Sequence, residues 1–247
     1  MSDHFPCYYM FMEFLPIKTR KFTPPQDQGN LYKLLDEFIP KLKNKDVVVI
    51  TSKIVAIHQG RFVPVKSMKQ KLQLIKQEAD GVIPGHIHGL TLKEAVLTPY
   101  AGIDRTNSNG HYILWPENPP LAAKKIWVYL KQKNNLKSFG VIIIDSFCLP
   151  LRWGHMGISI GFWGFHPNKN YANTKDIFGR KIIAGNSNLV DALSALSGTL
   201  MGEGAEQTPL LVIRGFVKLK FTDKNTLVEF RVNPKNDMYT PLLKQFK

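Results

Sequence analysis

The clearest hydrophobic pattern along the chain consists of short runs of β-branched residues. Residues 47–51 read Val-Val-Val-Ile-Thr, and residues 141–144 read Val-Ile-Ile-Ile. Runs without polar alternation are typical of strands that are buried on both faces. A third strand-like run extends from Leu210 to Phe216. We expect the first two segments to be strands that are buried on both faces, and the third to be a further strand.

Helical periodicity is clearest after Asn188, and Gly202 is a suitable stop signal for that helix. Its leucines share one predicted face: Leu189, Leu193, Leu196 and Leu200. Further amphipathic patterns span about Leu31 to Leu42 and Met68 to Ala79, the second lying before the Pro84-Gly85 turn signal. Interleaved strands and helices predict an α+β fold with mixed α/β layers.

The chain contains no internal repeat, low-complexity tract or Gly/Ser linker, so we expect a single unit over residues 1–247. Two lobes are a further expectation: residues 1–98 with 188–247, and residues 99–187. The proline-rich pieces Thr23 to Gln28 and Trp115 to Pro120 are interpreted as ordered loops.

Composition favours a cytoplasmic protein with a sizeable core. Of its 247 residues, 44% are hydrophobic, yet no stretch approaches the roughly 18 consecutive apolar residues of a membrane helix. Cys7 and Cys148 are the two cysteines of the sequence, which argues against a disulfide framework. The net charge of +14 favours anionic partners, but the lysines are scattered, which makes nucleic acid an unfavoured partner.

One acidic position is a candidate for metal chemistry, and a second is a candidate for binding a ligand. Asp145 and Ser146 directly follow the run 141–144, where oxygen ligands at a strand end suit Mg²⁺ or Mn²⁺. Asp104 precedes Asn107 by three residues, a spacing that could aim both groups at one ligand. In both segments, a turn stabilised by its own side chains is the competing interpretation.

Glu203 lies in a glycine-rich loop, Met201-Gly-Glu-Gly-Ala-Glu-Gln207, whose backbone could approach a phosphate. The loop lacks the ending of a P-loop and does not open a helix. It is therefore a weak signal by itself.

Other patterns are interpreted as structural. Gly157, Gly161 and Gly164 have the wrong order for a dinucleotide fingerprint and favour tight strand packing. His86 and His88 are expected to be surface histidines rather than zinc ligands. Cys148 is expected to be a packing residue, because no nucleophile motif surrounds it.

Six collinear segments together resemble the coenzyme F420-0:gamma-glutamyl ligase family, including its bacterial branch described as folate-metabolism gamma-glutamate ligases. The resemblance covers nearly the whole chain. Its segments are Leu15-Pro-Ile-Lys18, Val49 to Val55 with Gly60-Arg61, Tyr100 to Asn107, Ile144-Asp-Ser146 with Pro150 to Gly154, Asp176 to Arg180, and Leu200-Met-Gly-Glu203.

The resemblance implies a two-lobed fold and an intertwined homodimer. It implies a ligase that uses GTP, or ATP, to convert a small-molecule carboxylate into an acyl phosphate, which the amine of L-glutamate then attacks. Mg²⁺ or Mn²⁺ is implied as well, and K⁺ is a further candidate ion.

Carried over residue by residue, the resemblance implies metal ligands at Asp104, Asp145, Ser146 and Glu203. Nucleotide contacts are implied at Leu15, Pro16, Ile17, Ser52, Asn107, Met201, Gly202, Gly204, Ala205, Glu206 and Gln207. Lys53 and Arg152 are the candidate catalytic groups for stabilising a phosphate or acyl phosphate, Arg152 because a planar guanidinium matches these anions.

Two segments depart from the family pattern. A stretch in which family members commonly carry a lysine reads Ala56-Ile-His-Gln-Gly60 here, and the usual Gly-Arg-Pro-Trp reads Cys148-Leu-Pro-Leu151. These departures leave the acceptor open between F420-0, folate and another carboxylate. A basic nucleotide- or RNA-binding protein that has lost turnover is the non-enzymatic alternative.

Overall fold

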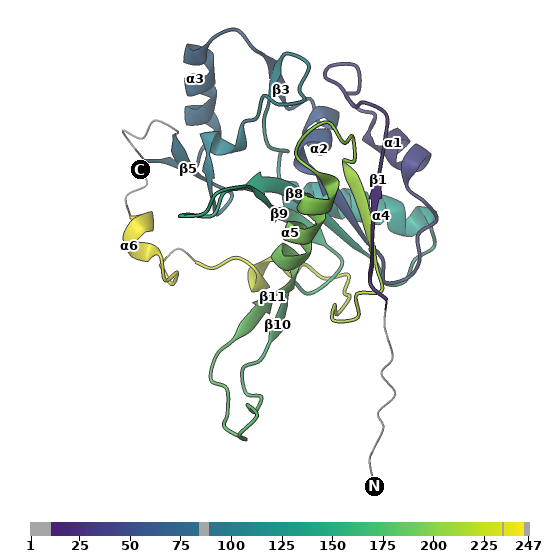
Figure 1. Ribbon diagram of the computed structural model, residues 1–247, viewed down its shortest axis with the longest axis vertical. Helices are drawn as coiled ribbons and strands as arrows, with labels where there is room; N and C mark the ends of the chain where they lie inside the picture. Colours follow the sequence, from purple (N-terminus) through teal and green to yellow (C-terminus); the bar gives the residue numbers. More distant parts are fainter. Residues whose placement is uncertain (1–10, 84–88, 234, 245–247) are drawn as a thin grey trace.

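The protein is described from a computed structural model that covers residues 11–83, 89–233 and 235–244 (Figure 1). Its centre is a five-stranded sheet. In spatial order the strands are β1 (Glu13–Ile17), β12 (Leu210–Arg214), β2 (Val47–Thr51), β8 (Gly140–Phe147) and β9 (Met156–Trp163). β2 and β8 are parallel, and the other neighbouring pairs are antiparallel.

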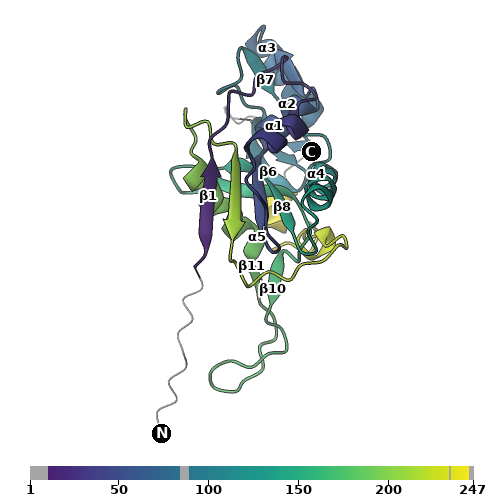
Figure 2. The same ribbon diagram turned by 90° about the vertical axis from the view of Figure 1, so that its right-hand side faces the viewer.

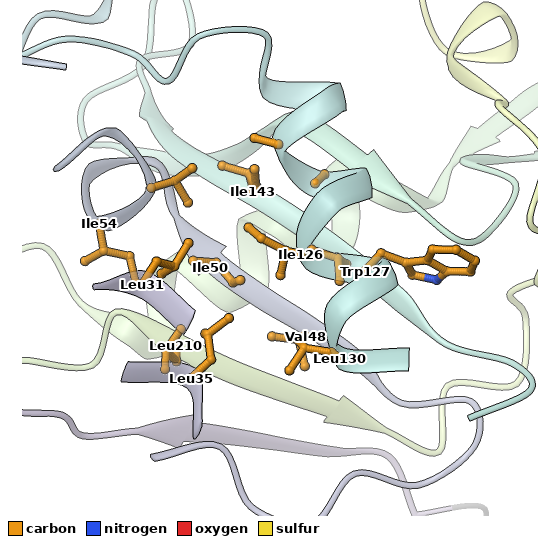
Figure 3. Packing of buried hydrophobic residues seen from close by; sticks show 14 of the residues in the cluster. Leu31, Leu35, Val48, Ile50, Ile54, Ile126, Trp127, Leu130, Ile143 and Leu210 are labelled. Atoms are coloured by element: carbon orange, nitrogen blue, oxygen red, sulfur yellow. The ribbon is translucent and has the colours of Figure 1, made fainter. Parts of the chain in front are cut away.

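Helices cover both faces of this sheet (Figure 2). One face carries α1 (Leu31–Phe38), α2 (Ser52–His58) and α4 (Pro119–Lys133), and the other carries α5 (Leu189–Met201). The core between the sheet and α1, α2 and α4 is called the first core, and the core on the α5 side is called the second core. Val48 and Ile50 point into the first core, beside Ile126 and Leu130 of α4 (Figure 3). Their neighbours on β2 pack into the second core, which confirms the expected strand with two buried faces.

Smaller elements surround the central sheet. Above it lie α3 (Met68–Glu78), the pair β3 (Phe62–Pro64) and β7 (His111–Ile113), and the sheet of β4 (Gly81–Val82), β5 (Leu90–Lys93) and β6 (Val96–Pro99). The short helix η1 (Tyr100–Gly102) follows β6. The pair β10 (Asn168–Asn170) and β11 (Asn186–Asn188) forms an arm that projects from the body in Figure 1. The chain ends with η2 (Leu227–Glu229) and α6 (Thr240–Leu243).

Several expected elements are confirmed, including the α+β class. The helix after Asn188 forms as α5, where the Asn188 side chain accepts a hydrogen bond from the Asp191 amide at 3.0 Å. Gly202 ends this helix with a φ of +81°. The expected leucine face is only half right, because Leu196 and Leu200 are 42% and 44% exposed.

The buried face of α5 is displaced toward small residues: Ser194, Ser197 and Gly198. A Cβ added to Gly198 would lie 2.9 Å from the Gly157 backbone on β9, so the two backbones are in direct contact. The helix therefore turns its smallest residues to the sheet, and periodicity of large side chains alone misjudges its orientation.

Two segments differ from the expected boundaries. α1 ends at Phe38 rather than near Leu42, because Ile39 precedes Pro40 and adopts an extended conformation. Pro119 and Pro120 are not loop residues, because they occupy the first turn of α4, where proline needs no hydrogen-bonded amide. α4 itself, the longest helix of the described residues, has no counterpart among the expected elements.

Other expectations have mixed outcomes. Cys148 is an exposed free thiol rather than a packing residue, whereas Cys7, His86 and His88 lie outside the described residues. The central sheet takes β8 and β9 from one expected lobe and its other strands from the second, and the lobe boundaries stay a prediction, as does the homodimer. Within the described ranges, no helix combines the length and apolarity needed to cross a membrane.

Candidate functional site

A cavity of about 590 Å³ opens where β2 and β8 end, at the start of α2 and the end of α5. Three loops complete its walls: residues 19–23, residues 104–109 and residues 202–209. The parallel pair β2 and β8 thus directs its carboxyl ends into the cavity, which is where ligands commonly meet such sheets.

Asp145 lies at the base of this cavity. β8 continues to Phe147, so Asp145 lies within the strand rather than after it, but its parallel neighbour β2 ends one residue earlier, where Thr51 pairs with Ile144. Ser52 Oγ donates to Asp145 Oδ1 at 2.8 Å, and the Trp115 indole donates to Oδ2 at 2.5 Å. Both donors are neutral, and within the described ranges no lysine or arginine forms an ion pair with Asp145.

Burial governs the titration of this carboxyl group. Desolvation raises the pKa of Asp145 to about 6, although the hydrogen bonds from Ser52 and Trp115 lower it. The negative charge of Asp104 raises it further, which shows that the two carboxylates influence one another electrostatically.

Asp104 is held in a turn and by an ion pair. Its Oδ1 accepts hydrogen bonds from the amides of Arg105 and Thr106, so the self-capped turn expected as the competing interpretation is present. Lys53 Nζ lies 2.6 Å from Asp104 Oδ2. Burial alone would raise the pKa of Asp104, but Lys53 and Thr106 hold it below its usual range.

The glycine-rich loop after α5 closes the cavity. Ser146 Oγ lies 2.7 and 2.9 Å from the two carboxylate oxygens of Glu203. Asn107 Nδ2 donates to the Gly204 carbonyl at 2.7 Å, which joins the turn of Asp104 to this loop. Segments that are about 100 residues apart in sequence therefore form one wall.

These groups suit a hard divalent cation by their chemistry. Asp104, Asp145, Ser146 and Glu203 offer carboxylate and hydroxyl oxygens to the same cavity, as Mg²⁺ and Mn²⁺ prefer. A buried carboxylate with only neutral partners is stabilised when a cation binds beside it. No three histidine, cysteine or acidic side chains within the described ranges cluster closely enough to hold a metal on their own.

The structure brings most of the candidate residues together. The cavity is lined by Ser52, Lys53, Asp104, Asn107, Asp145, Ser146, Met201, Gly202, Glu203, Gly204, Ala205, Glu206 and Gln207. Leu15, Pro16 and Ile17 lie on β1 and do not line it, and Leu15 and Ile17 pack against the first core instead. Arg152 lies exposed in the loop between β8 and β9, also outside the lining.

Some lining residues had no signal in the sequence. Thr19 to Thr23 line the cavity, whereas the expected contacts were at residues 15–17. The Thr19 amide donates to the Gln207 carbonyl at 2.9 Å. Arg20 adds a cation to this wall and is paired with Asp27 at 2.8 Å. A basic residue a few positions after a strand is too common a pattern to reveal such a position.

The glycines of β9 serve packing, as expected. A Cβ on Gly157 would lie 2.3 Å from the Ser194 carbonyl oxygen, and one on Gly161 would lie 2.5 Å from the Pro119 backbone. These contacts place α5 and α4 directly on the strand.

Residues 56–60, the first segment that departs from the family pattern, belong largely to α2. Ile57 in this segment is completely buried in the first core.

Comparison with known proteins gives concordant results. The model of the F420-0:Gamma-glutamyl ligase family matches residues 28–215. A coenzyme F420:L-glutamate ligase of Methanosarcina mazei is 29% identical over 222 residues, which cover 83% of this chain and 87% of that protein. Proteins of the same name from Methanocaldococcus jannaschii and Methanococcus maripaludis are 29% and 30% identical, over 77% of this chain and 77% and 84% of theirs.

Proposed function

Because the chain belongs to the F420-0:gamma-glutamyl ligase family, we propose that it joins L-glutamate to a small-molecule carboxylate through an amide bond. The co-substrate is GTP, or ATP, and the supporting ion is Mg²⁺ or Mn²⁺, with K⁺ as a further candidate. Coenzyme F420-0 is the leading acceptor, since the matching family is described as F420-0:Gamma-glutamyl ligase and the similar proteins carry the name coenzyme F420:L-glutamate ligase.

One observation carries this proposal: Asp104, Asp145 and Glu203, which come from three distant segments, line the same cavity. Carboxylates that line one partly buried cavity repel one another unless a positive charge is present. A nucleoside triphosphate is itself anionic, so it can bind in a cavity lined by carboxylates only together with cations. The collinear family segments and the shared cavity therefore support the same chemistry.

The proposed reaction has two steps, a phosphoryl transfer and the formation of the amide bond. An oxygen of the acceptor carboxylate attacks the γ-phosphorus, forming an acyl phosphate while the bond to the nucleoside diphosphate breaks. The amine of L-glutamate then attacks the acyl carbon, inorganic phosphate leaves, and the amine loses a proton. A divalent ion bound by Asp104, Asp145, Ser146 and Glu203 would neutralise charge on the transferred phosphoryl group.

The chain's own residues bind and orient the reactants. Lys53 lies at the cavity wall beside Asp104, where its ammonium can stabilise phosphate oxygens. Ser52 holds Asp145, and Asn107 fixes the loop of Gly204, which lines the cavity where the nucleotide would bind. Arg152 reaches this chemistry only if its loop approaches the cavity, so its catalytic role stays a prediction.

The experiment is a reconstituted reaction. Purified protein is incubated with GTP or ATP, Mn²⁺ or Mg²⁺, L-glutamate and either coenzyme F420-0 or a folate, and the products are analysed by mass spectrometry. We expect nucleotide turnover together with the addition of one glutamyl mass to an acceptor. Absence of both across all acceptors contradicts the proposal, and Asp145→Ala is the inactive reference.

Folate is the second candidate acceptor, and the departing segments favour it. Ile57 is buried where family members commonly carry a lysine, and Cys148 to Leu151 differ from the usual Gly-Arg-Pro-Trp at the exit of β8. Neither segment lines the cavity, so both changes leave its acidic residues in place. Competition between coenzyme F420-0 and a folate for limiting enzyme distinguishes the two acceptors.

The non-enzymatic alternative rests on the net charge of +14. It predicts salt-sensitive RNA binding that survives Asp145→Ala, because phosphate contacts by scattered lysines do not involve the cavity. The ligase predicts instead that this substitution abolishes binding of nucleotide with Mn²⁺. Filter binding at two salt concentrations, with and without nucleotide, separates these outcomes.

A further inference from the structure

The indole of Trp115 lies between the segments that carry Asp104 and Asp145. Trp115 is 1% exposed, and its Nε1 donates to Oδ2 of Asp145. The same N–H edge of the indole also contacts Gly102, two residues before Asp104: a Cβ on Gly102 would lie 2.1 Å from Trp115 Nε1. The side chain is therefore in contact with both segments at once.

The hydrogen bond restricts Asp145 without neutralising it. An indole N–H can only donate, and a carboxylate offers about four lone-pair positions. The indole uses one position on Oδ2, and the Ser52 hydroxyl uses one on Oδ1. The Ser146 backbone amide is a third hydrogen-bond donor to this carboxylate. About one position is therefore left for a ligand in the cavity, and the charge of the carboxylate is kept.

The contact with Gly102 fixes the second segment. Tyr100, Ala101 and Gly102 all have positive φ values, of +56°, +54° and +71°, so the backbone curls tightly around the indole. Only glycine leaves space for the ring at its position. Asp104 follows directly from this curl, and its place depends on where the indole lies.

The backbone of Trp115 is also held. Its carbonyl accepts a hydrogen bond from Arg61 Nε at 3.1 Å, and the neighbouring Leu114 amide donates to the Arg61 carbonyl at 3.0 Å. With its backbone bonded and its ring enclosed by the first core, the indole cannot follow a movement of either carboxylate. One fixed side chain thus contacts both the Asp145 carboxylate and the segment that leads to Asp104.

From these contacts, and resting on the proposed function, we propose that Trp115 is a positioning residue. It orients the Asp145 carboxylate so that its remaining lone pair is directed into the cavity, and it sets the spacing between Asp145 and Asp104. Trp115 does not line the cavity itself, so it acts on bound ligands only through these carboxylates.

Trp115→Phe removes the donor and keeps an aromatic ring. Trp127→Phe is the matched control, because Trp127 is also buried, at 7% exposure, and donates from Nε1 to the Phe139 carbonyl at 2.8 Å, away from the cavity. Mn²⁺ affinity is measured by electron paramagnetic resonance with GTP present, and kcat and KM are measured for glutamate addition. Thermal unfolding reports the structural effect of each variant.

We expect Trp115→Phe to weaken Mn²⁺ affinity and lower kcat by about 10- to 100-fold, as is typical when a ligand loses its supporting partner. Trp127→Phe should lower the unfolding midpoint and leave Mn²⁺ affinity unchanged. Replacement of Trp115 by 3-benzothienylalanine, in which sulfur stands in place of the N–H, preserves the ring shape. It should reproduce the loss of affinity with little change in unfolding, and it decides the question if Trp115→Phe does not fold.

Wild-type Mn²⁺ affinity and turnover in the benzothienyl variant would overturn this inference and leave the proposed ligase intact. The reverse failure looks different: a wild-type protein that binds no Mn²⁺ with GTP and transfers no glutamate contradicts the ligase itself.

Discussion

Ser146 and Glu203 are hydrogen-bonded to one another in the wall of the cavity, with the serine hydroxyl 2.7 and 2.9 Å from the two carboxylate oxygens. Ser146 belongs to β8 and Glu203 to the loop after α5, so this contact joins the sheet to the loop. Both side chains are exposed and line the cavity, and the proposed function assigns them to a common ion.

Glu203→Ala should therefore lower activity more than stability. Removal of one oxygen ligand should raise the Mn²⁺ concentration for half-maximal turnover by at least about tenfold. Glu117→Ala is the control, because it removes one exposed acidic side chain outside the cavity lining. An unchanged metal requirement in Glu203→Ala would exclude this residue from the metal site.

Lys53→Met should lower kcat by about a hundredfold, since it removes the cation that the proposed function places beside the phosphates. Lys131→Met is the matched control: Lys131 pairs with Asp223 at 2.7 Å and has 19% side-chain exposure, against 24% for Lys53. Each variant should lose no more than about 1 kcal/mol of unfolding free energy, as is usual for partly exposed ion pairs. Equal kcat values in the two variants would make the Lys53 ion pair purely structural.

Glu78 should make stability depend on pH in the acid range. Burial alone would raise the pKa of Glu78, but hydrogen bonds from Lys93 and Arg61 hold it below its usual value of 4.5. Because the folded pKa is lowered, this stabilisation is complete above pH 4.5 and is lost as the pH falls through the folded value.

The test compares Glu78→Gln with the wild type by urea unfolding at pH 7 and at pH values below 4.5. We expect a loss of about 1 kcal/mol at pH 7 that shrinks as the pH is lowered. Glu94→Gln provides the comparison, because Glu94 pairs with a single arginine, Arg231, at a more exposed site and should contribute less. A difference for Glu78→Gln that stays constant with pH would contradict the assignment.

Gly157→Ala should destabilise the protein by about 1–3 kcal/mol, because the new methyl group would collide with the backbone of α5. The methyl carbon would lie 2.3 Å from the Ser194 carbonyl oxygen, which cannot move without displacing the helix. Gly185→Ala is the control, since its nearest neighbours lie at 3.9 Å. Equal unfolding midpoints by circular dichroism would show that the helix accommodates the methyl group.

Local sequence determined the elements whose signals are local. The run 47–50 has no polar residue, and it became a strand buried on both faces. Asn188 and Gly202 mark the two ends of α5. The Asn188 side chain caps an amide of the first turn and Gly202 adopts a positive φ, and both effects act within one helical turn. The collinear segments also indicated the family, since a series of motifs in the right order is visible without coordinates.

Tertiary structure decided everything that depends on distant segments. Leu196 and Leu200 follow helical periodicity, yet contact between Gly157 and Gly198 turned the small residues of α5 toward the sheet. The place of Trp115 between two carboxylates has no counterpart in sequence spacing. The three acidic residues share one cavity because strand pairing and helix packing fold distant segments together, and no local pattern encodes those distances.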